Sequence, residues 1–276
     1  MIENYTTLDP NFLFIGCGKM GLAILQKFIE NNFINSDSIN VITKNSKISI
    51  LPKNQSFNQI SQLPSDYKAD IIFLCLKPQD IEDVLQEFVK SNKFNQNSIF
   101  ISIIAGKTIS YFTKILGKDA KLLRTMPNLA IKNSCGILPY LANKNITTKE
   151  LNYIVSLFND FSLTFDIKEE SLFGVITAMF GCGPAYIFLL QEIICDIAIK
   201  NGLDPLLATN LVKKLFLGSA LMTQNDDVDF KKSRLDVTSK NGVTQSLTDI
   251  LQKDNSFKNL FNEAINNAIA RSKELS

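Results

Sequence analysis

The sequence contains no histidine among its 276 residues. Without imidazole there is no Ser-His-Asp or Cys-His nucleophile system and no histidine-bound zinc or haem iron. Any proton transfer must use carboxylates, lysine, tyrosine, hydroxyl groups or water. An excess of charge is also missing, because 29 Lys and Arg face 27 Asp and Glu, a formal net charge of +2. We therefore expect no nucleic acid, no anionic membrane surface and no metal among the partners.

Paired cysteines are missing too. The chain has five cysteines, an odd number, and no CxxC pair: Cys17, Cys75, Cys135, Cys182 and Cys195. This usage indicates small buried side chains in a reducing compartment. The first residues lack the basic and apolar regions of a signal peptide. The most apolar long stretch, 185–199, is interrupted by Gln191, Glu192 and Asp196, so spanning a bilayer would be costly. We expect a soluble cytoplasmic protein.

Short apolar runs alternate with helix-like segments over the first 165 or so residues. Runs of this length, apolar on both sides, are typical of strands buried on both faces of a parallel sheet. The runs are Phe12–Ile15, Ile39–Thr43, Ile71–Leu76, Ile99–Ile104 and, more weakly, Lys121–Arg124. The helices expected between them are 18–31, 78–90 with Pro78 in the first turn, 109–116 ending at Gly117, and one from the capping box Thr147–Glu150 to about Asp160. The alternation predicts a doubly wound α/β domain over residues 1–166.

After about Asp166 the strand-like runs disappear. Helix starts are expected at Gly183-Pro184, Asp204-Pro205, Ser246–Asp249 and about Ser256, and Gly202 ends the first of these helices. Residues 167–276 are therefore predicted to form an all-helical domain.

The helix expected at 184–200 is apolar over most of its circumference. Only Glu192, Asp196 and Lys200 form a polar line, at i, i+4 and i+8. Because a small helical domain cannot easily cover such a helix, we predict a homodimer in which the C-terminal helices of two chains pack together. The alternative, a helix at the centre of its own domain, stays open.

A glycine motif follows the first predicted strand directly and opens the first helix. Gly16 permits the tight turn, Gly18 lets the backbone approach a pyrophosphate, and Gly21 lets the helix pack close to the strand. The helix N-terminus then offers N–H groups and a positive dipole end to phosphates. This context predicts a dinucleotide site.

The segment after the second strand selects between NAD and NADP. An acid there would bind a ribose 2′-hydroxyl, but residues 43–47, Thr-Lys-Asn-Ser-Lys, contain none, and Asp37 precedes the strand. Hydroxyl, amide and ammonium groups suit a 2′-phosphate, so we predict NADP, with NADPH preferred over NADH. The alternative is that Lys44 and Lys47 are solvated surface lysines.

Three further turns are expected at the same carboxyl edge of the sheet: Leu76–Gln79, Ser102–Gly106 and Arg124–Asn128. We expect them to converge on one crevice. The candidate cofactor-binding residues are Gly16, Cys17, Gly18, Lys19, Met20, Thr43, Lys44, Cys75, Leu76, Lys77, Pro78, Ile104 and Ala105.

Together with Gly181–Tyr186 and Val237–Thr244, these motifs resemble the pyrroline-5-carboxylate reductase family in order and spacing over nearly the whole chain. The resemblance implies a Rossmann domain followed by a helical dimerisation domain, often assembled into a ring of dimers. It also implies hydride transfer from NAD(P)H to the imine carbon of 1-pyrroline-5-carboxylate, which gives L-proline in proline biosynthesis.

In that family the loop that corresponds to 239–244 holds the substrate carboxylate with backbone N–H groups and hydroxyls. The resemblance therefore makes Ser239, Gly242, Val243 and Thr244 the candidate substrate-binding residues. The family usually has Ser-Pro-Gly-Gly-Thr/Ala-Thr, whereas residues 240 and 241 here are Lys and Asn. Asparagine tolerates left-handed backbone, so the turn can survive the change.

The implied reaction needs little acid–base machinery, because a protonated imine is already electrophilic and the cofactor carries the hydride. Thr244 is the candidate catalytic residue, making a hydrogen bond with the ring nitrogen or the carboxylate. The alternative role for Ser239 and Thr244 is only to cap a helix, and for Tyr186 packing is favoured over proton donation. Two other functions stay open: an NADP-dependent reductase of another imine or hydroxy acid, and a dinucleotide-binding regulatory protein with a decayed substrate loop.

Overall fold

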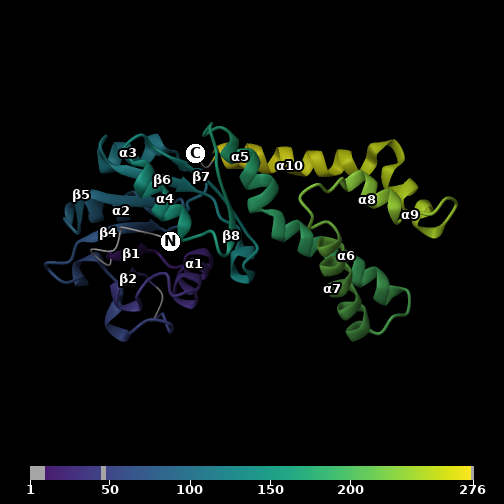
Figure 1. Cartoon of the computed structure of the whole chain (residues 1–276), viewed down its shortest axis with the longest axis horizontal. Coiled ribbons are helices and arrows are strands. Elements are labelled where there is room, and N and C mark those ends of the chain that lie inside the picture. Colours follow the sequence, from purple (N-terminus) through teal and green to yellow (C-terminus); the bar gives the residue numbers. More distant parts are fainter. Residues whose placement is uncertain (1–9, 45–47, 275–276) are drawn as a thin grey trace. The chain divides into compact units, whose positions relative to one another are not determined.

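In the computed structural model, which describes residues 10–44 and 48–274, eight strands form one sheet in the order β3-β2-β1-β4-β5-β6-β7-β8 (Figure 1). Neighbouring strands are parallel except β6 and β7, which are antiparallel. The first six strands have the order of the doubly wound dinucleotide-binding fold. The strands are β1 Phe12–Ile15, β2 Ile39–Ile42, β3 Ser56–Phe57, β4 Ala69–Leu74, β5 Phe94–Ser102, β6 Lys121–Thr125, β7 Gly136–Ala142 and β8 Ser162–Asp166.

The core lies on both faces of this sheet, as the apolar runs predict. Phe12 and Phe14 of β1 enter one hydrophobic cluster, while Leu13 and Ile15 enter the other, because successive side chains of a strand point to opposite faces. Helices α1 (Lys19–Glu30) and α4 (Thr148–Ser156) cover the first face, and α2 (Ile81–Lys90) and α3 (Ile109–Leu116) cover the second. The doubly wound α/β architecture is therefore confirmed.

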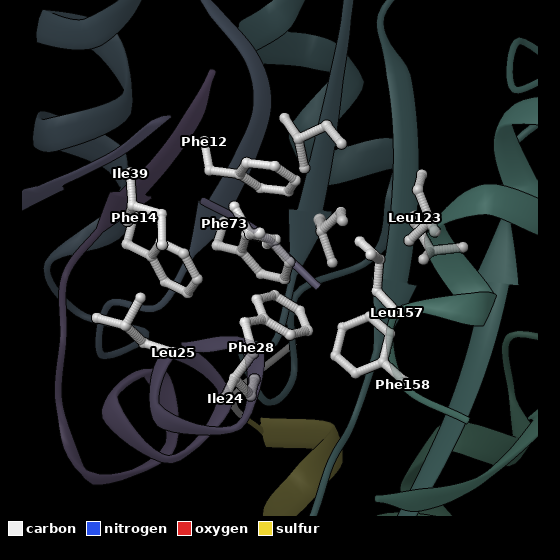
Figure 2. Packing of buried hydrophobic residues seen from close by; sticks show 14 of the residues in the cluster. Phe12, Phe14, Ile24, Leu25, Phe28, Ile39, Phe73, Leu123, Leu157 and Phe158 are labelled. Carbon is white, nitrogen blue, oxygen red and sulfur yellow. The ribbon is translucent and has the colours of Figure 1, made fainter. Parts of the chain in front are cut away.

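Phenylalanine dominates the cluster between α1 and the sheet (Figure 2). The rings of Phe14 and Phe73 stack with centroids 4.5 Å apart, and Phe28 of α1 meets both edge-on at 6.4 and 5.6 Å. Phe158, just after α4, closes the group with its centroid 5.3 Å from that of Phe28. Each fully buried ring contributes about 1.5–3 kcal/mol through burial, so this cluster fixes α1 firmly against β1 and β4.

Local signals set several helix ends as expected. The Thr147–Glu150 capping box is formed in both directions, and Gly117 ends α3 with a φ of +98°. Two boundaries were wrong. Helix α4 ends at Ser156 rather than near 160, and α2 begins at Ile81, because Pro78 lies in a tight turn closed by a bond from Asp80 N–H to Lys77 O (3.0 Å).

Three strands lack a clear sequence signal. β3 has two residues, β7 contains a proline and a glycine, and β8 alternates polar with apolar residues and leaves Leu163 69% exposed. Proline has no backbone N–H to donate to a neighbouring strand, so the sequence around Pro139 does not predict an interior strand. The described chain also has short 3-10 turns at Ser36–Ser38, Lys53–Gln55, Ile60–Gln62, Leu129–Asn133 and Lys253–Asn255.

The chain divides into two compact units, Met1–Cys182 with Ala268–Ser276, and Gly183–Asn267. The first also contains α5 (Leu172–Ile176) and a π-helical turn at Thr177–Gly181, and the functional boundary expected at residue 166 stays a prediction. The helices that follow are α6 Gly183–Lys200, α7 Pro205–Met222, α8 Phe230–Asp236, α9 Val243–Gln252 and α10 Ser256–Glu274. The Asp204 carboxylate caps α7 by accepting from Leu207 N–H at 3.0 Å, as expected. The helix start expected at Ser246–Asp249 was wrong, since these residues lie inside α9, which begins after Gly242.

The helices of the second unit leave much apolar surface uncovered. Phe188 is 63% exposed, Ile197 56% and Leu206 71%, although Ala208 and Val212 are buried. By length and composition alone, the helical stretch Leu172–Lys200 is apolar enough to cross a membrane. An 18-residue segment of it has a mean hydropathy of 1.8, and 11% of that segment is buried. The stretch also contains Glu192 and Asp196, whose charges are costly in a bilayer, so its length and composition alone do not identify what covers it.

Candidate functional site

A cleft of about 460 Å³ opens at the carboxyl ends of β1, β2 and β4. The strand order reverses between β1 and β4, and ligands of open α/β sheets bind at such a switch point. Its walls bring together the predicted residues Gly16, Cys17, Gly18, Thr43, Lys44, Cys75, Leu76 and Lys77. The other wall residues are Ile15, Ile42, Asn58, Gln59, Ile60, Asp80, Val84 and Glu87.

Gly16 makes the turn from β1 into this cleft. Its φ is +83°, and a Cβ there would lie 2.7 Å from the carbonyl oxygen of Cys75. The turn is held on both sides, because Gly16 N–H donates to Ile42 O and Cys75 N–H donates to Ile15 O, each at 2.8 Å. Only glycine fits this position without strain.

The other two glycines have different surroundings. A Cβ on Gly21 would lie 3.1 Å from the Cβ of Cys75, so a bare backbone lets α1 pack close to β4. A Cβ on Gly18 would meet nothing within 4 Å. Gly18 is also the N-cap of α1, with no side chain to cap the first N–H groups. The arrangement leaves open space beside unsatisfied donors, which is what a bound phosphate requires.

Two cysteines flank the glycine turn. Burial raises the pKa of Cys17 to about 11, and burial, with Cys17 nearby, raises the pKa of Cys75 well above its ordinary value. Both thiols therefore stay protonated at neutral pH and place no negative charge beside a phosphate. Neither is suited to act as a nucleophile.

The end of the cleft beside β2 contains residues that the sequence reasoning missed. Thr43 N–H donates to Phe57 O at 2.9 Å, which draws the short strand β3 alongside and brings Asn58 and Gln59 next to Thr43 and Lys44. A two-residue strand gives no hydrophobic run, so only the Asn-Gln pair after Ser-Phe could have signalled it. Asp37 lies in the 3-10 turn before β2, at the opposite end of that strand, as expected.

Charge along this cleft is mixed. The cations Lys44 and Lys77 share its walls with Asp80 and Glu87, so an anion would be held by local groups rather than by a general positive field. Residues 45–47, the rest of the predicted 2′-phosphate segment, lie outside the described residues.

The remaining cofactor candidates lie near the cleft but not in its walls. Lys19 and Met20 form the first turn of α1, and Pro78 lies in the turn after Lys77. Ile104 and Ala105 follow β5 at the same edge, since the register pairs Leu74 with Ser102. Ile104 is only 2% exposed as a whole residue, whereas Ala105 is half-buried, so Ala105 is the one of the two that can face a ligand.

Arg124, expected at the crevice, is bound within its own unit instead. Its guanidinium donates to Glu170 Oε1 at 2.7 Å and lies 4.2 Å from the centre of the Phe173 ring. The same carboxylate oxygen accepts the first N–H of α3, from Ile109, at 2.8 Å. Asn128 is also engaged, donating to Phe180 O at 3.1 Å. These bonds tie the end of β6 to α3 and to the segment before α6.

The candidate substrate loop lies in the second unit, where 239–242 form a β-turn closed by Gly242 N–H donating to Ser239 O at 3.0 Å. A Cβ on Gly242 would lie 2.2 Å from Ser239 Oγ, so glycine is required for that hydroxyl to lie over the turn. Gly242 is the N-cap of α9 and offers no capping side chain, and Val243 and Thr244 occupy the exposed first turn. Hydroxyl groups and helix N–H groups are thereby gathered in one place, which suits a carboxylate.

Tyr186 is the remaining candidate residue from the sequence. Tyr186 packs edge-on against Phe261, with ring centroids 5.1 Å apart. Among the residues that the structure describes, no group of three or more Cys, Asp or Glu could hold a metal ion.

Comparison with known proteins matches both units. A family model described as pyrroline-5-carboxylate reductase dimerisation matches residues 170–275, and one described as NADP oxidoreductase coenzyme F420-dependent matches 11–106. Pyrroline-5-carboxylate reductase of Staphylococcus epidermidis is 29% identical over 270 residues, covering 96% of this chain and 97% of the relative. That of Escherichia coli is 28% identical over 276 residues, covering 98% and 99%.

Solved structures agree with these relatives. Pyrroline carboxylate reductase of Plasmodium falciparum with NADP bound has a TM-score of 0.86 at 28% identity, covering 97% of this chain and 98% of that one. A pyrroline-5-carboxylate reductase from Coxiella burnetii has a TM-score of 0.82 at 28% identity, covering 98% and 99%. With the glycine turn at the switch point and a reductase-type helical unit in one chain, the protein belongs to the pyrroline-5-carboxylate reductase family.

Proposed function

We propose that the chain reduces 1-pyrroline-5-carboxylate to L-proline, with NADPH as the hydride donor. One observation carries the proposal. The chain has both open space for a dinucleotide phosphate at Gly18 and a loop suited to a carboxylate at Ser239–Thr244, and such reductases match it along its length. The glycines of this chain are what make room for the dinucleotide. Gly16 allows a turn in which a Cβ would strike Cys75 O, and Gly18 leaves open space beside the start of α1.

The residues of the cleft would hold the dinucleotide. The N–H groups at the start of α1 would bind the pyrophosphate, and Thr43, Lys44 and Asn58 would surround the 2′-phosphate. When bound, the cofactor supplies the hydride. The mixture of hydroxyl, ammonium and amide groups in place of an acid supports NADPH over NADH.

The loop of the helical unit would bind and orient the substrate. Ser239 Oγ and the first N–H groups of α9 would donate hydrogen bonds to the carboxylate. The Thr244 hydroxyl would accept a hydrogen bond from the protonated ring nitrogen or donate one to the carboxylate. The imine enters protonated and electrophilic, so no side chain has to deliver a proton before reduction. This accounts for how a chain without histidine can perform the reaction.

The direct test is NADPH oxidation by the purified chain. We expect turnover with 1-pyrroline-5-carboxylate and a lower KM for NADPH than for NADH. Turnover only with 1-piperideine-6-carboxylate or an acyclic keto acid would favour a reductase of another imine or hydroxy acid. NADPH binding without turnover of any of them would favour a regulatory protein, the function that the changes at Lys240 and Asn241 support.

We also propose that a second copy of the chain covers the apolar face of α6 and α7. The exposed Phe188, Ile197 and Leu206 supply a surface of the kind that two identical helical units bury together, and the dimerisation match covers these helices. Glu192 and Asp196 would be costly inside a bilayer, which favours a protein partner and a cytoplasmic location.

The mass in detergent-free buffer tests this assembly. Light scattering should give twice 30.9 kDa, or a larger multiple if dimers form a ring. A mass of one chain, or solubility only with detergent, contradicts the assembly without touching the catalytic proposal.

A further inference from the structure

The β-turn at 239–242 is built from residues that do little to hold it. Asn241, at its third position, has a φ of +59°, and a positive φ at that position alone is the pattern of a type II turn. Such turns favour proline at the second position and glycine at the third, because proline fixes φ and glycine adopts positive φ without strain. Here those positions are Lys240 and Asn241. Lysine does not fix φ, and asparagine tolerates positive φ but adopts it less freely than glycine.

One side chain makes up for this. Gln245, in the first turn of α9, accepts a hydrogen bond on Oε1 from the backbone N–H of Asn241 at 2.7 Å. Its side chain is half-buried, whereas Asn241 and Thr244 are exposed. The bond holds Asn241, with its positive φ, through a side chain of α9. It therefore couples the turn to the start of that helix.

The consequence reaches the candidate carboxylate site. Ser239 Oγ lies over Gly242 only while the turn is closed by Gly242 N–H and Ser239 O. If the turn opens, the hydroxyl at 239 and the N–H groups of α9 no longer face one ligand.

We propose that Gln245 is a positioning residue for the substrate carboxylate, acting through Asn241 in place of a Pro-Gly turn. The role rests on the proposed function. Gln245 does not touch the substrate. Its side chain keeps Ser239 and the start of α9 in the arrangement that binds it.

The experiment compares Gln245→Ala with a matched control, Gln252→Ala, at the far end of the same helix, where the glutamine bonds to Thr248 O and Arg234 instead. We expect Gln245→Ala to raise the KM for 1-pyrroline-5-carboxylate about fivefold. The KM for NADPH should not change, and kcat should fall less than twofold. Fivefold is the factor given by one hydrogen bond of about 1 kcal/mol. Gln252→Ala should leave all three constants unchanged.

A rescue separates positioning from general damage. Adding Lys240→Pro and Asn241→Gly to Gln245→Ala supplies the turn with its preferred residues and should return the KM to within twofold of wild type. An unchanged KM in Gln245→Ala, an equal rise in the KM for NADPH, or no recovery in the triple variant overturns the proposal.

Hydrogen exchange of the 238–244 segment provides a readout that needs no turnover. Exchange should accelerate in Gln245→Ala, stay at the wild-type rate in Gln252→Ala and slow again in the triple variant. If the wild-type chain turns over no imine, the proposed function fails and the positioning role fails with it. If the wild type is active and exchange does not change in Gln245→Ala, only the positioning role is overturned.

Discussion

Two glycines at the start of α1 allow folding to be separated from cofactor binding. At Gly16 the φ is +83° and a Cβ would lie 2.7 Å from Cys75 O, so alanine strains the protein itself. At Gly18 the φ is −73° and a Cβ would meet nothing within 4 Å, so alanine projects into open space where the pyrophosphate is proposed to lie. The same substitution two residues apart should therefore have opposite consequences.

The expected magnitudes differ clearly. Left-handed backbone costs a non-glycine residue about 1–2 kcal/mol and overpacking about 1–3 kcal/mol, so Gly16→Ala should lose about 2–5 kcal/mol. At about 2–4 °C per kcal/mol, its Tm should fall by about 4–20 °C. Gly18→Ala replaces a favoured N-cap residue by a poor one, which costs about 0.5–1 kcal/mol, and its Tm should fall by about 1–4 °C.

Binding should show the reverse order of effects. A methyl group at position 18 keeps the phosphates from the N–H groups of α1, and hydrogen bonds to charged groups contribute about 1.5–3 kcal/mol each. The Kd for NADPH should therefore rise at least about 10-fold in Gly18→Ala, as measured by calorimetric titration. Gly218→Ala, where a Cβ also meets nothing within 4 Å, is the control and should bind like the wild type. An unchanged Kd in Gly18→Ala would refute the assignment of this space to the pyrophosphate.

Three other substitutions or modifications probe the remaining parts. Thr244→Ala should lower kcat/KM for 1-pyrroline-5-carboxylate at least about 10-fold, or about 1.4 kcal/mol of transition-state stabilisation, in steady-state assays. Glu170→Ala should lower the thermal stability by about 2–4 kcal/mol in calorimetry, because it leaves the buried Arg124 without its carboxylate. Cys17, whose pKa is raised to about 11 by burial, should react with iodoacetamide at pH 7.5 at least about 10-fold more slowly than the exposed Cys182, followed by peptide mass spectrometry.

Each of these has a matched control. Thr248→Ala, one helical turn further along α9, should keep its kcat/KM, and an unchanged kcat/KM in Thr244→Ala would show that its role is misassigned. Asp166→Ala removes the exposed partner of Lys168 and should leave the Tm unchanged. An equal fall in Tm in Asp166→Ala and Glu170→Ala would show that the Arg124–Glu170 pair stabilises the fold no more than an exposed ion pair does. Equal labelling rates for the two cysteines would mean that the glycine turn is open to solvent.

Sequence patterns were sufficient for the elements whose signals are local. The run Phe12–Ile15, the glycines after it and the capping box at Thr147 fix their own geometry through side-chain alternation, backbone freedom and side-chain hydrogen bonds. The same holds for the Asp204-Pro205 helix start. The misses have a common cause. β7 and the short β3 are strands only because neighbouring strands supply their partners, and α2 starts late because the turn after Lys77 uses Pro78.

For the candidate site the division is similar. Motifs placed Gly16, Gly18 and Lys44 in one cleft, but Asn58 and Gln59 enter it only through the pairing of β3 with β2. Arg124 stands in a motif that points to the crevice, yet its charge is neutralised by Glu170, 46 residues away in the chain.

By itself, the sequence determined the doubly wound architecture, the glycine turn and the helical second half, because periodicity, glycine spacing and caps act over a few residues. Only the tertiary structure decided which residues share the walls of the cleft and which charges are paired. These depend on contacts between segments brought together by strand pairing and helix packing, and no local pattern encodes such a distance.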